Sequence, residues 1–303
     1  MSLIYQMILK QMKAQQKKGG SFRLGTDEEI IAGRKFIDDP KNQMPPVKGV
    51  AIQSEKIRDI PVEKLVPKKI EMPGAILYYI HGGGFCYGNE ITSRGFGTAL
   101  AESLGVEVYT VGYRLAPENK FPAGVDDCFA VYQELLKRYP DRKIGLIGES
   151  GGGTYVLTTA LKAKAAGLRM PECIYSMNPL TTLAEDLPSR QNYEIDLVVP
   201  IKDANAVLGR PYLEEGQDKR DPLVSPLYGD YTGFPPVKIT VDVSEILHDD
   251  STYLAAHMQE QGVRVDLKEL KGFFHSFPAI GNVCPESKAL MDETKRFFRN
   301  YLL

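Results

Sequence analysis

Lys143-Ile-Gly-Leu-Ile-Gly-Glu-Ser-Gly-Gly152 is the stretch from which the fold of this 303-residue sequence is best inferred. It runs from a short apolar strand, residues 143–147, through Gly148-Glu-Ser-Gly-Gly152 into a helical segment that continues to Ala166. A serine on a sharp strand-to-helix turn needs small neighbours, because the chain doubles back tightly there. The amides and dipole of the following helix also favour negative charge at this point. We therefore predict that Ser150 is a nucleophile.

This glycine-rich turn has two other interpretations. One is a turn that only caps the following helix, and the other is a phosphate-binding loop. A phosphate-binding loop requires a lysine followed by serine or threonine after the glycines, whereas Thr154-Tyr155 stand there. The strand before the turn and the helix after it favour a nucleophile over a simple cap.

Strands and helices alternate on both sides of this turn. Short apolar runs predict strands at residues 50–57, 62–70, 75–80, 106–111, 143–147, 173–177, 237–241 and 263–267, the first two being edge strands. Helices are predicted at residues 92–104, 124–138, 152–166, 251–262 and 286–302. Such alternation indicates an α/β protein with a doubly wound, mostly parallel sheet of about eight strands.

The N-terminal residues predict two helices. The first places five apolar residues roughly on one face and is broken by a glycine pair: Leu3, Ile4, Met7, Ile8 and Met12, then Gly19-Gly20. Thr26 and Glu29 match a capping box, so a second helix should begin there and end before Pro40. The apolar face of the first helix is short and few lysines flank it. Packing on its own protein is therefore favoured over lying on a membrane.

Residues 183–218 interrupt the alternation of strands and helices. They carry Pro188, Pro200 and Pro211 among scattered apolar residues. The segment is too long for a plain connection, so we predict an insertion with short helices.

A second glycine-rich segment, His81-Gly-Gly-Gly-Phe85, follows the strand predicted at residues 75–80. Acyl transfer creates an oxyanion, which needs N–H donors already in place, and glycines let backbone amides approach a substrate closely. Gly83 and Gly84 are the predicted donors from this loop, and Gly151, after the nucleophile, is the third. His81 is expected to be structural.

A serine nucleophile needs a base, and the sequence has four histidines. His257 lies within a predicted helix, and His248 precedes an acidic pair. The expected order is serine, acid, histidine, and only His275 leaves room for an acid after the strand at residues 237–241, the penultimate one, so His275 is the predicted base. Four acids follow the strand at residues 237–241 and remain candidates: Asp242, Glu245, Asp249 and Asp250. The last two also suit the cap of the next helix.

The composition excludes several classes of protein. The sequence is 43% hydrophobic and 25% charged with a net charge of -2, which is ordinary for a globular protein and offers no basic surplus for nucleic acid. No apolar run is long enough to span a membrane, and the N-terminus lacks the order of parts of a signal peptide, so a cytoplasmic protein is expected. Four well-separated cysteines predict buried free thiols: Cys86, Cys128, Cys173 and Cys284.

Together these motifs resemble the hormone-sensitive-lipase-like family of carboxylesterases. The matching segments are His81-Gly-Gly-Gly-Phe85, Tyr113-Arg-Leu-Ala-Pro-Glu118, Phe121-Pro-Ala123 with Asp126-Asp127, Gly148-Glu-Ser-Gly-Gly152, Asp221-Pro-Leu-Val-Ser-Pro-Leu227 and Phe274-His275. They stand in family order between Ile76 and Phe277. Relatives usually have Gly-Asp-Ser-Ala-Gly at the turn, so Glu149 and Gly151 are departures.

The resemblance also bears on the acid. Aligning Leu247 and Asp249 with the last two fixed residues of the family pattern Asp-Pro-Leu-x-Asp places Glu245 at the catalytic position. A glutamate there departs from the usual aspartate, and Asp242 remains the second candidate.

The resemblance implies an α/β-hydrolase fold in two parts. Residues 1–45 and 183–218 would form a helical cap, and residues 46–182 and 219–303 the catalytic core. Apolar residues of the insertion that would line the substrate pocket are Tyr193, Ile195, Leu197, Val198 and Leu208. Packing between cap and core is an equally good role for them.

The implied reaction is hydrolysis of small, short-acyl carboxylic esters by Ser150, His275 and Glu245, with no metal or organic cofactor. The expected partner is a small ester, and the assembly is left open, a homodimer included. Two alternatives remain. A non-catalytic ligand-binding relative would lack the base, whereas His275 is present. An amidase or peptidase would use the same three residues, and only substrate profiling separates it from an esterase.

Overall fold

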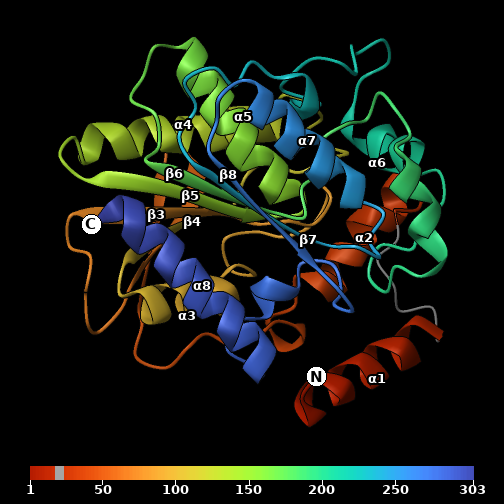
Figure 1. Ribbon diagram of the computed structural model, residues 1–303, viewed down its shortest axis with the longest axis horizontal. Helices are drawn as coiled ribbons and strands as arrows, with labels where there is room; N and C mark the ends of the chain where they lie inside the picture. Colours follow the sequence, from red (N-terminus) through yellow and green to blue (C-terminus); the bar gives the residue numbers. More distant parts are fainter. Residues whose placement is uncertain (18–23) are drawn as a thin grey trace.

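A single sheet lies between two layers of helices in the computed structural model, which describes residues 1–17 and 24–303 (Figure 1). The strands are β1 Ala51–Ile57, β2 Ile60–Val66, β3 Ala75–Ile80, β4 Glu107–Val111, β5 Lys143–Glu149, β6 Cys173–Met177, β7 Val237–Asp242 and β8 Val265–Leu270. Their spatial order is β1-β2-β4-β3-β5-β6-β7-β8. Strands β3 to β8 pair in parallel, and β1 and β2 join antiparallel. The predicted doubly wound, mostly parallel sheet is confirmed.

Helices cover both faces of this sheet. The helices of the described residues are α1 Leu3–Lys17, α2 Asp27–Ile37, α3 Arg94–Leu104, α4 Ala123–Arg138, α5 Gly151–Ala165, α6 Ala204–Tyr212, α7 His248–Glu260 and α8 Pro285–Leu302. Helices α3 and α8 lie on one face, and α4, α5 and α7 on the other (Figure 1). Every residue of β3, β4, β6 and β7 is buried, because helices cover both faces of these strands and neighbouring strands flank them.

The prediction that residues 62–70 form an edge strand is wrong. Strand β2 pairs on one side with β1 and on the other with β4. Arg58 and Asp59 both adopt positive φ, 49° and 68°, which makes the tight turn that folds β1 back over β2. The strand ends at Val66 because Pro67 follows and has no amide for the ladder.

The N-terminal helices confirm one prediction and correct another. Thr26 accepts a bond from the Glu29 amide and Glu29 accepts one from the Thr26 amide, so the capping box of α2 is present. In α1, however, the fully buried residue is Tyr5, while Leu3 and Met7 are exposed. The buried face of α1 packs on the loop after β8, where the ring of Tyr5 contacts those of Phe273 and Phe277. The predicted break at Gly19-Gly20 lies outside the described residues.

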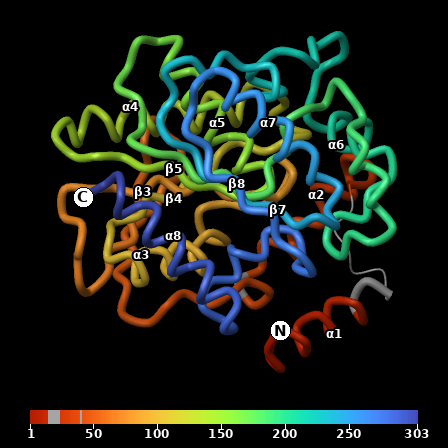
Figure 2. Tube along the Cα trace, in the orientation of Figure 1, coloured from red at the N-terminus to blue at the C-terminus, as the bar shows by residue number. Residues whose placement is uncertain are grey.

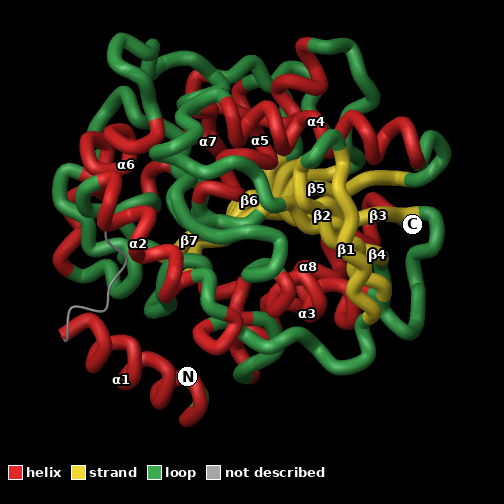
Figure 3. Tube along the Cα trace, turned by 180° about the vertical axis from the view of Figure 1, so that it is seen from behind, coloured by secondary structure: helices red, strands yellow, loops and turns green. Residues whose placement is uncertain are grey.

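The insertion contains the short helices that its sequence predicts. They are a 3-10 helix, Pro188–Glu194, and α6, which holds Pro211 near its end. Helix α6 lies beside α2 at one end of the sheet in opposite views (Figures 1 and 3), where Arg210 pairs with Asp27. The division of the chain into cap and core remains a proposal.

The helices and the cysteines each bear on an expectation from the sequence. Within residues 1–17 and 24–303, no helix is both long and apolar enough to cross a membrane. The prediction for the cysteines is confirmed, since all four are free and buried: Cys86, Cys128, Cys173 and Cys284.

Candidate active site

Ser150 stands on the turn between β5 and α5 in a strained conformation, with φ 55° and ψ -123°. Positive φ is rare for a residue with a side chain and is typical of a serine held at such a turn. The flanking glycines leave no space for larger residues. A Cβ on Gly148 would lie 2.8 Å from the carbonyl oxygen of Ile80, and one on Gly152 would lie closer still. The sequence therefore forces the chain through a turn that presents the Ser150 side chain.

The glycine-rich loop after β3 lies against this turn because β3 and β5 are neighbours in the sheet. Ile80 and Gly148 are paired at the ends of these strands. Gly83 and Gly84 have φ of 105° and 58°, which glycine adopts without strain. Both line the same cavity as Ser150 and Gly151. The structure thus brings the four residues together, as the sequence predicts.

His275 and Glu245 form a buried pair beside this cavity. His275 Nδ1 lies 2.6 Å from Glu245 Oε2, and the two residues are 6% and 1% exposed. The other carboxylate oxygen, Oε1, accepts the Asp242 amide at 2.9 Å and the side-chain amide of Asn178. The Glu245 carboxylate is therefore held in one orientation toward the imidazole.

Asn178 is a site residue that the sequence reasoning missed. It directly follows β6, which lies between the strand that leads to Ser150 and the strand that leads to Glu245. A polar residue at the carboxyl end of a central parallel strand was the available signal.

Asp242, the alternative acid, makes a different set of contacts. Its Oδ1 accepts the amide and hydroxyl of Ser244, and its Oδ2 accepts the Phe273 amide at 2.7 Å. Asp242 thus ties β7 to the loop that carries His275, whereas the imidazole of His275 bonds to Glu245.

Asp249 and Asp250 suit the cap of the following helix by sequence, but neither caps it in the structure. Helix α7 begins at His248 and has no side-chain cap, so both acids lie inside its first turn. Asp250 is fully buried, pairs with Arg190 and accepts the Thr181 amide at 2.7 Å. Both carboxylates bond to the insertion, since Asp249 Oδ2 accepts the Ser189 amide at 2.8 Å and Asp250 pairs with Arg190.

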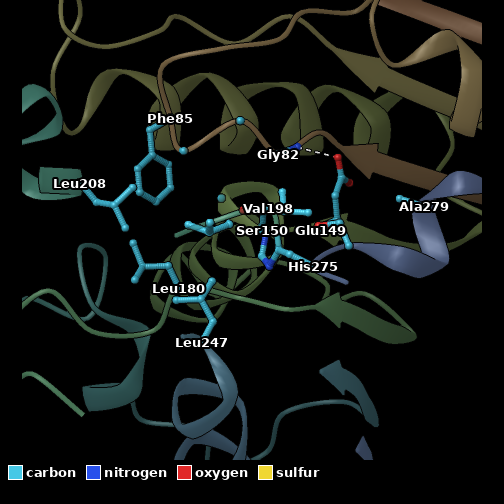
Figure 4. Close-up of a pocket in the computed structure, with 15 residues that line it drawn as sticks. Gly82, Phe85, Glu149, Ser150, Leu180, Val198, Leu208, Leu247, His275 and Ala279 are labelled. Carbon is cyan, nitrogen blue, oxygen red and sulfur yellow. Dashed lines mark hydrogen bonds between the residues drawn. The ribbon is translucent and has the colours of Figure 1, made fainter. Parts of the chain in front are cut away.

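The surroundings of His275 raise the pKa of its imidazole. Burial lowers the pKa of His275, but the charge and hydrogen bond of Glu245 outweigh it, so the net pKa is above 6.5. His275 Nε2 is buried and has no hydrogen-bond partner among the described residues. Ser150 and His275 lie next to each other among the lining residues (Figure 4). The free ring nitrogen is the one that a serine hydroxyl would need.

The other histidines make local contacts. His81 stacks on Tyr113 with ring centroids 4.2 Å apart, and burial lowers the pKa of His81 to about 4. His248 contacts Asp249 and Glu269. His257 contacts the Gly229 carbonyl.

The cavity has a volume of about 240 Å³ and two unlike ends (Figure 4). Phe85, Leu180, Leu208 and Leu247 lie toward its apolar end, and Gly82, Glu149 and Ala279 lie toward the other. The remaining lining residues include Val198, Val199 and Ser276. Val198 and Leu208 therefore line the cavity, as expected. Tyr193, Ile195 and Leu197 are not lining residues.

Among the described residues, no group of three or more histidine, cysteine, aspartate or glutamate side chains is arranged to bind a metal ion.

Comparison with known proteins places the chain in a family. Residues 77–279 match the family model described as the alpha/beta hydrolase fold. An acetyl-hydrolase of Streptomyces hygroscopicus is 32% identical over 228 residues, 75% of this chain and 76% of that protein. An esterase of Acinetobacter venetianus is 31% identical over 268 residues, 87% of this chain and 84% of its own length.

A solved structure extends the likeness to almost every residue. The crystal structure of an esterase from the bacterial hormone-sensitive lipase family superposes with a TM-score of 0.87 and 26% identity, covering 100% of this chain and 99% of the other. Sequence and structure therefore agree. The chain belongs to the α/β-hydrolase fold family and, within it, to the hormone-sensitive-lipase-like carboxylesterases, and it is a carboxylic ester hydrolase.

Proposed function

We propose that this esterase hydrolyses small, short-acyl esters through an acyl-enzyme, with Ser150 as nucleophile, His275 as base and Glu245 as the acid that orients it. The observation that carries the proposal is the buried pair of His275 and Glu245, whose free ring nitrogen belongs to the same cavity as Ser150.

In the first half of the reaction, His275 Nε2 takes the proton of Ser150 Oγ as this oxygen attacks the ester carbonyl carbon. The carbonyl electrons move onto oxygen, and the amides of Gly83, Gly84 and Gly151 stabilise the resulting oxyanion. Glu245 stabilises the imidazolium. When the intermediate collapses, the carbon–oxygen bond to the alcohol breaks and His275 protonates the departing alcohol.

In the second half, water takes the place of the alcohol. His275 removes a proton from the water, whose oxygen attacks the acyl carbon, and the second intermediate releases the carboxylic acid while Ser150 recovers its proton. In each step of this reaction, His275 is the group that accepts or donates the proton.

The short-acyl preference is supported by the cavity. Its volume of about 240 Å³ is below the range of about 300–1,000 Å³ typical of pockets for drug-sized ligands. Phe85, Leu180 and Leu208 surround its apolar end. The name of the acetyl-hydrolase relative points the same way.

The test compares p-nitrophenyl acetate, butyrate and octanoate with p-nitroacetanilide, using the wild type and Ser150→Ala. We expect kcat/KM for acetate or butyrate to exceed that for octanoate by about tenfold or more, because a longer chain clashes with the apolar end. The variant should lose nearly all activity. Hydrolysis that survives in Ser150→Ala would refute the nucleophile, and faster cleavage of the anilide than of the esters would favour an amidase.

A further inference from the structure

The residue before the nucleophile carries a buried carboxyl group that the proposed mechanism does not use. Glu149 ends β5, and its Oε1 accepts the Gly82 amide at 2.8 Å and the Tyr79 hydroxyl at 3.0 Å. Its Oε2 is buried and has no hydrogen-bond partner among the described residues. Figure 4 shows the bond from Gly82 to Glu149 beside Ser150. One carboxylate oxygen therefore joins the nucleophile turn to the loop after β3.

Gly82 approaches this turn too closely for any other residue to take its place. A Cβ on Gly82 would lie 2.8 Å from the Glu149 carbonyl oxygen and 3.1 Å from Ser150 Cβ. The loop and the turn are packed backbone against backbone here, so the Gly82 amide has the Glu149 side chain within reach. The next two residues, Gly83 and Gly84, line the cavity.

We propose that Glu149 is a positioning residue that sets the oxyanion loop against the nucleophile by accepting the Gly82 amide through Oε1. Gly83 and Gly84 follow Gly82 directly and have the conformational freedom of glycine, so a shift at Gly82 would move both of their amides. The inference rests on the proposed function, because it assumes that these amides hold the oxyanion. A displacement of about 1 Å at such donors is enough to cost about a hundredfold in rate.

The charge of Glu149 provides a second, separable effect. Burial raises the pKa of Glu149 to about 7. The titratable groups that face it are Tyr79 from β3, Tyr113 from the segment after β4 and His275 from the loop after β8. A carboxyl oxygen accepts the Gly82 amide in either protonation state. The negative charge, when present, raises the pKa of His275. Loss of the Glu149 acceptor oxygen should therefore lower kcat. Loss of the Glu149 negative charge should instead shift the acidic limb of the pH profile.

The experiment compares two variants of nearly equal length, Glu149→Gln, which keeps the acceptor oxygen, and Glu149→Met, which removes it. We expect Glu149→Met to lower kcat by about a hundredfold with little change in KM, because the lost alignment matters in the transition state. Glu149→Gln should stay within about fivefold of the wild-type kcat. Its acidic limb should move to lower pH, because the charge that raises the pKa of His275 is gone.

Binding of an alkyl boronic acid, which becomes tetrahedral and anionic on Ser150, gives a readout that general loss of packing would not move. Its affinity should fall in Glu149→Met by the same factor as kcat, while the product alcohol should bind as it does to the wild type. Should Glu149→Met fail to fold, Glu149→Ala removes the acceptor without adding bulk and should show the same kcat loss.

Tyr79→Phe is the matched control, since it removes the other hydrogen bond to Oε1 and leaves the Gly82 bond in place. It should stay within about threefold of the wild type. Wild-type kcat in both Glu149→Met and Glu149→Ala, or an equal loss in Tyr79→Phe, would overturn the inference. The proposed function would stand in that case as long as Ser150→Ala is inactive, whereas an active Ser150→Ala would overturn the proposed function itself.

Discussion

At the scale of single residues, Asp242 and Glu245 are both buried acids at the carboxyl end of β7, and their contacts give them different tasks. Glu245 bonds to the imidazole of His275, whereas Asp242 holds the Ser244 and Phe273 amides. Sequence order alone leaves both acids open, because they lie three positions apart on the same turn. The direction of each carboxylate depends on partners far along the chain, of which Asn178 is one.

Glu245→Gln should lower kcat by about a thousandfold or more, because an amide no longer stabilises the imidazolium. Asp242→Asn should instead mainly lower the free energy of unfolding, by about 1–3 kcal/mol, since an amide nitrogen would face the buried Phe273 amide. Steady-state kinetics and urea unfolding of both variants check this prediction. A larger kcat loss in Asp242→Asn than in Glu245→Gln would indicate that Asp242 is the acid of the triad and that Glu245 has the structural role.

The pH profile of kcat/KM follows from the pKa of His275. Only the neutral imidazole accepts the Ser150 proton, so activity should fall as the pH drops through a pKa that lies above 6.5. In Glu245→Gln the charge that raises this pKa is removed while burial, which lowers it, remains. The acidic limb should therefore move to lower pH, which residual kcat/KM across the range from pH 5 to about 8 would show. A limb that stays in place would mean that another group titrates.

At the scale of elements, the insertion holds the loop that carries Glu245. Asp196 accepts the Ile246 amide at 3.2 Å and the Val198 and Val199 amides at 3.0 and 2.8 Å. Asn192 donates to the Glu245 carbonyl at 3.1 Å. One buried carboxylate thus ties a wall of the cavity to the backbone beside the proposed acid.

Asp196→Ala should lower both stability and activity, because it leaves three backbone amides, two of them buried, without their acceptor. We expect a loss of about 2–4 kcal/mol in the free energy of unfolding and about tenfold in kcat. Asp186→Ala, an exposed acid of the same insertion, serves as the control and should be neutral. Thermal melting and ester kinetics measure both, and a stable, fully active Asp196→Ala would exclude this role.

Helix α1 contacts the loop that carries His275, as the insertion contacts the loop that carries Glu245. Tyr5 is fully buried, stacks on Phe274, contacts Phe273 and Phe277, and donates its hydroxyl to the Gly272 carbonyl at 2.7 Å. These rings flank His275 in the sequence. Tyr5→Ala should destabilise the protein by about 3–5 kcal/mol and reduce kcat, while Met7→Ala, which is 70% exposed, should change neither. A full-activity Tyr5→Ala would show that α1 does not support the His275 loop.

The sequence predicts well those elements whose own residues specify them. The central strands are continuous apolar runs, and α2 begins with a capping box, so both can be identified from a short stretch of sequence. The interior position of β2 and the buried face of α1 are not predictable in this way. Both depend on what packs against the element: the β1 hairpin in one case and the aromatic loop after β8 in the other.

At the scale of the whole molecule, the cavity lies between the ends of the sheet and the insertion. Its apolar end combines Phe85 from the loop after β3, Leu180 from the segment after β6 and Leu208 from α6. Segments distant in sequence thus set its size, which is why sequence patterns predict only two of the insertion residues that line it, Val198 and Leu208.

Leu208→Ala should shift the acyl preference toward longer chains. Leu208 is 4% exposed, and its removal would extend the apolar end of the cavity. The ratio of kcat/KM for octanoate to that for butyrate should rise by about tenfold. Ile195→Ala, in the same insertion but 60% exposed, should leave the ratio unchanged. An unchanged ratio in Leu208→Ala would place the acyl chain elsewhere.

The contact between α1 and the loop after β8 also has a consequence for biosynthesis. Figure 2 shows the red first helix near blue segments from late in the chain, and Tyr5 and Gly272 are separated by 267 positions. At typical ribosomal speeds of about 5–20 residues per second, α1 must wait roughly ten to fifty seconds for its partner to be made. During translation Tyr5 stays uncovered and the His275 loop does not yet exist. Among the described residues, Tyr5 therefore has no aromatic partner until the ribosome has added the loop after β8, more than 260 positions later.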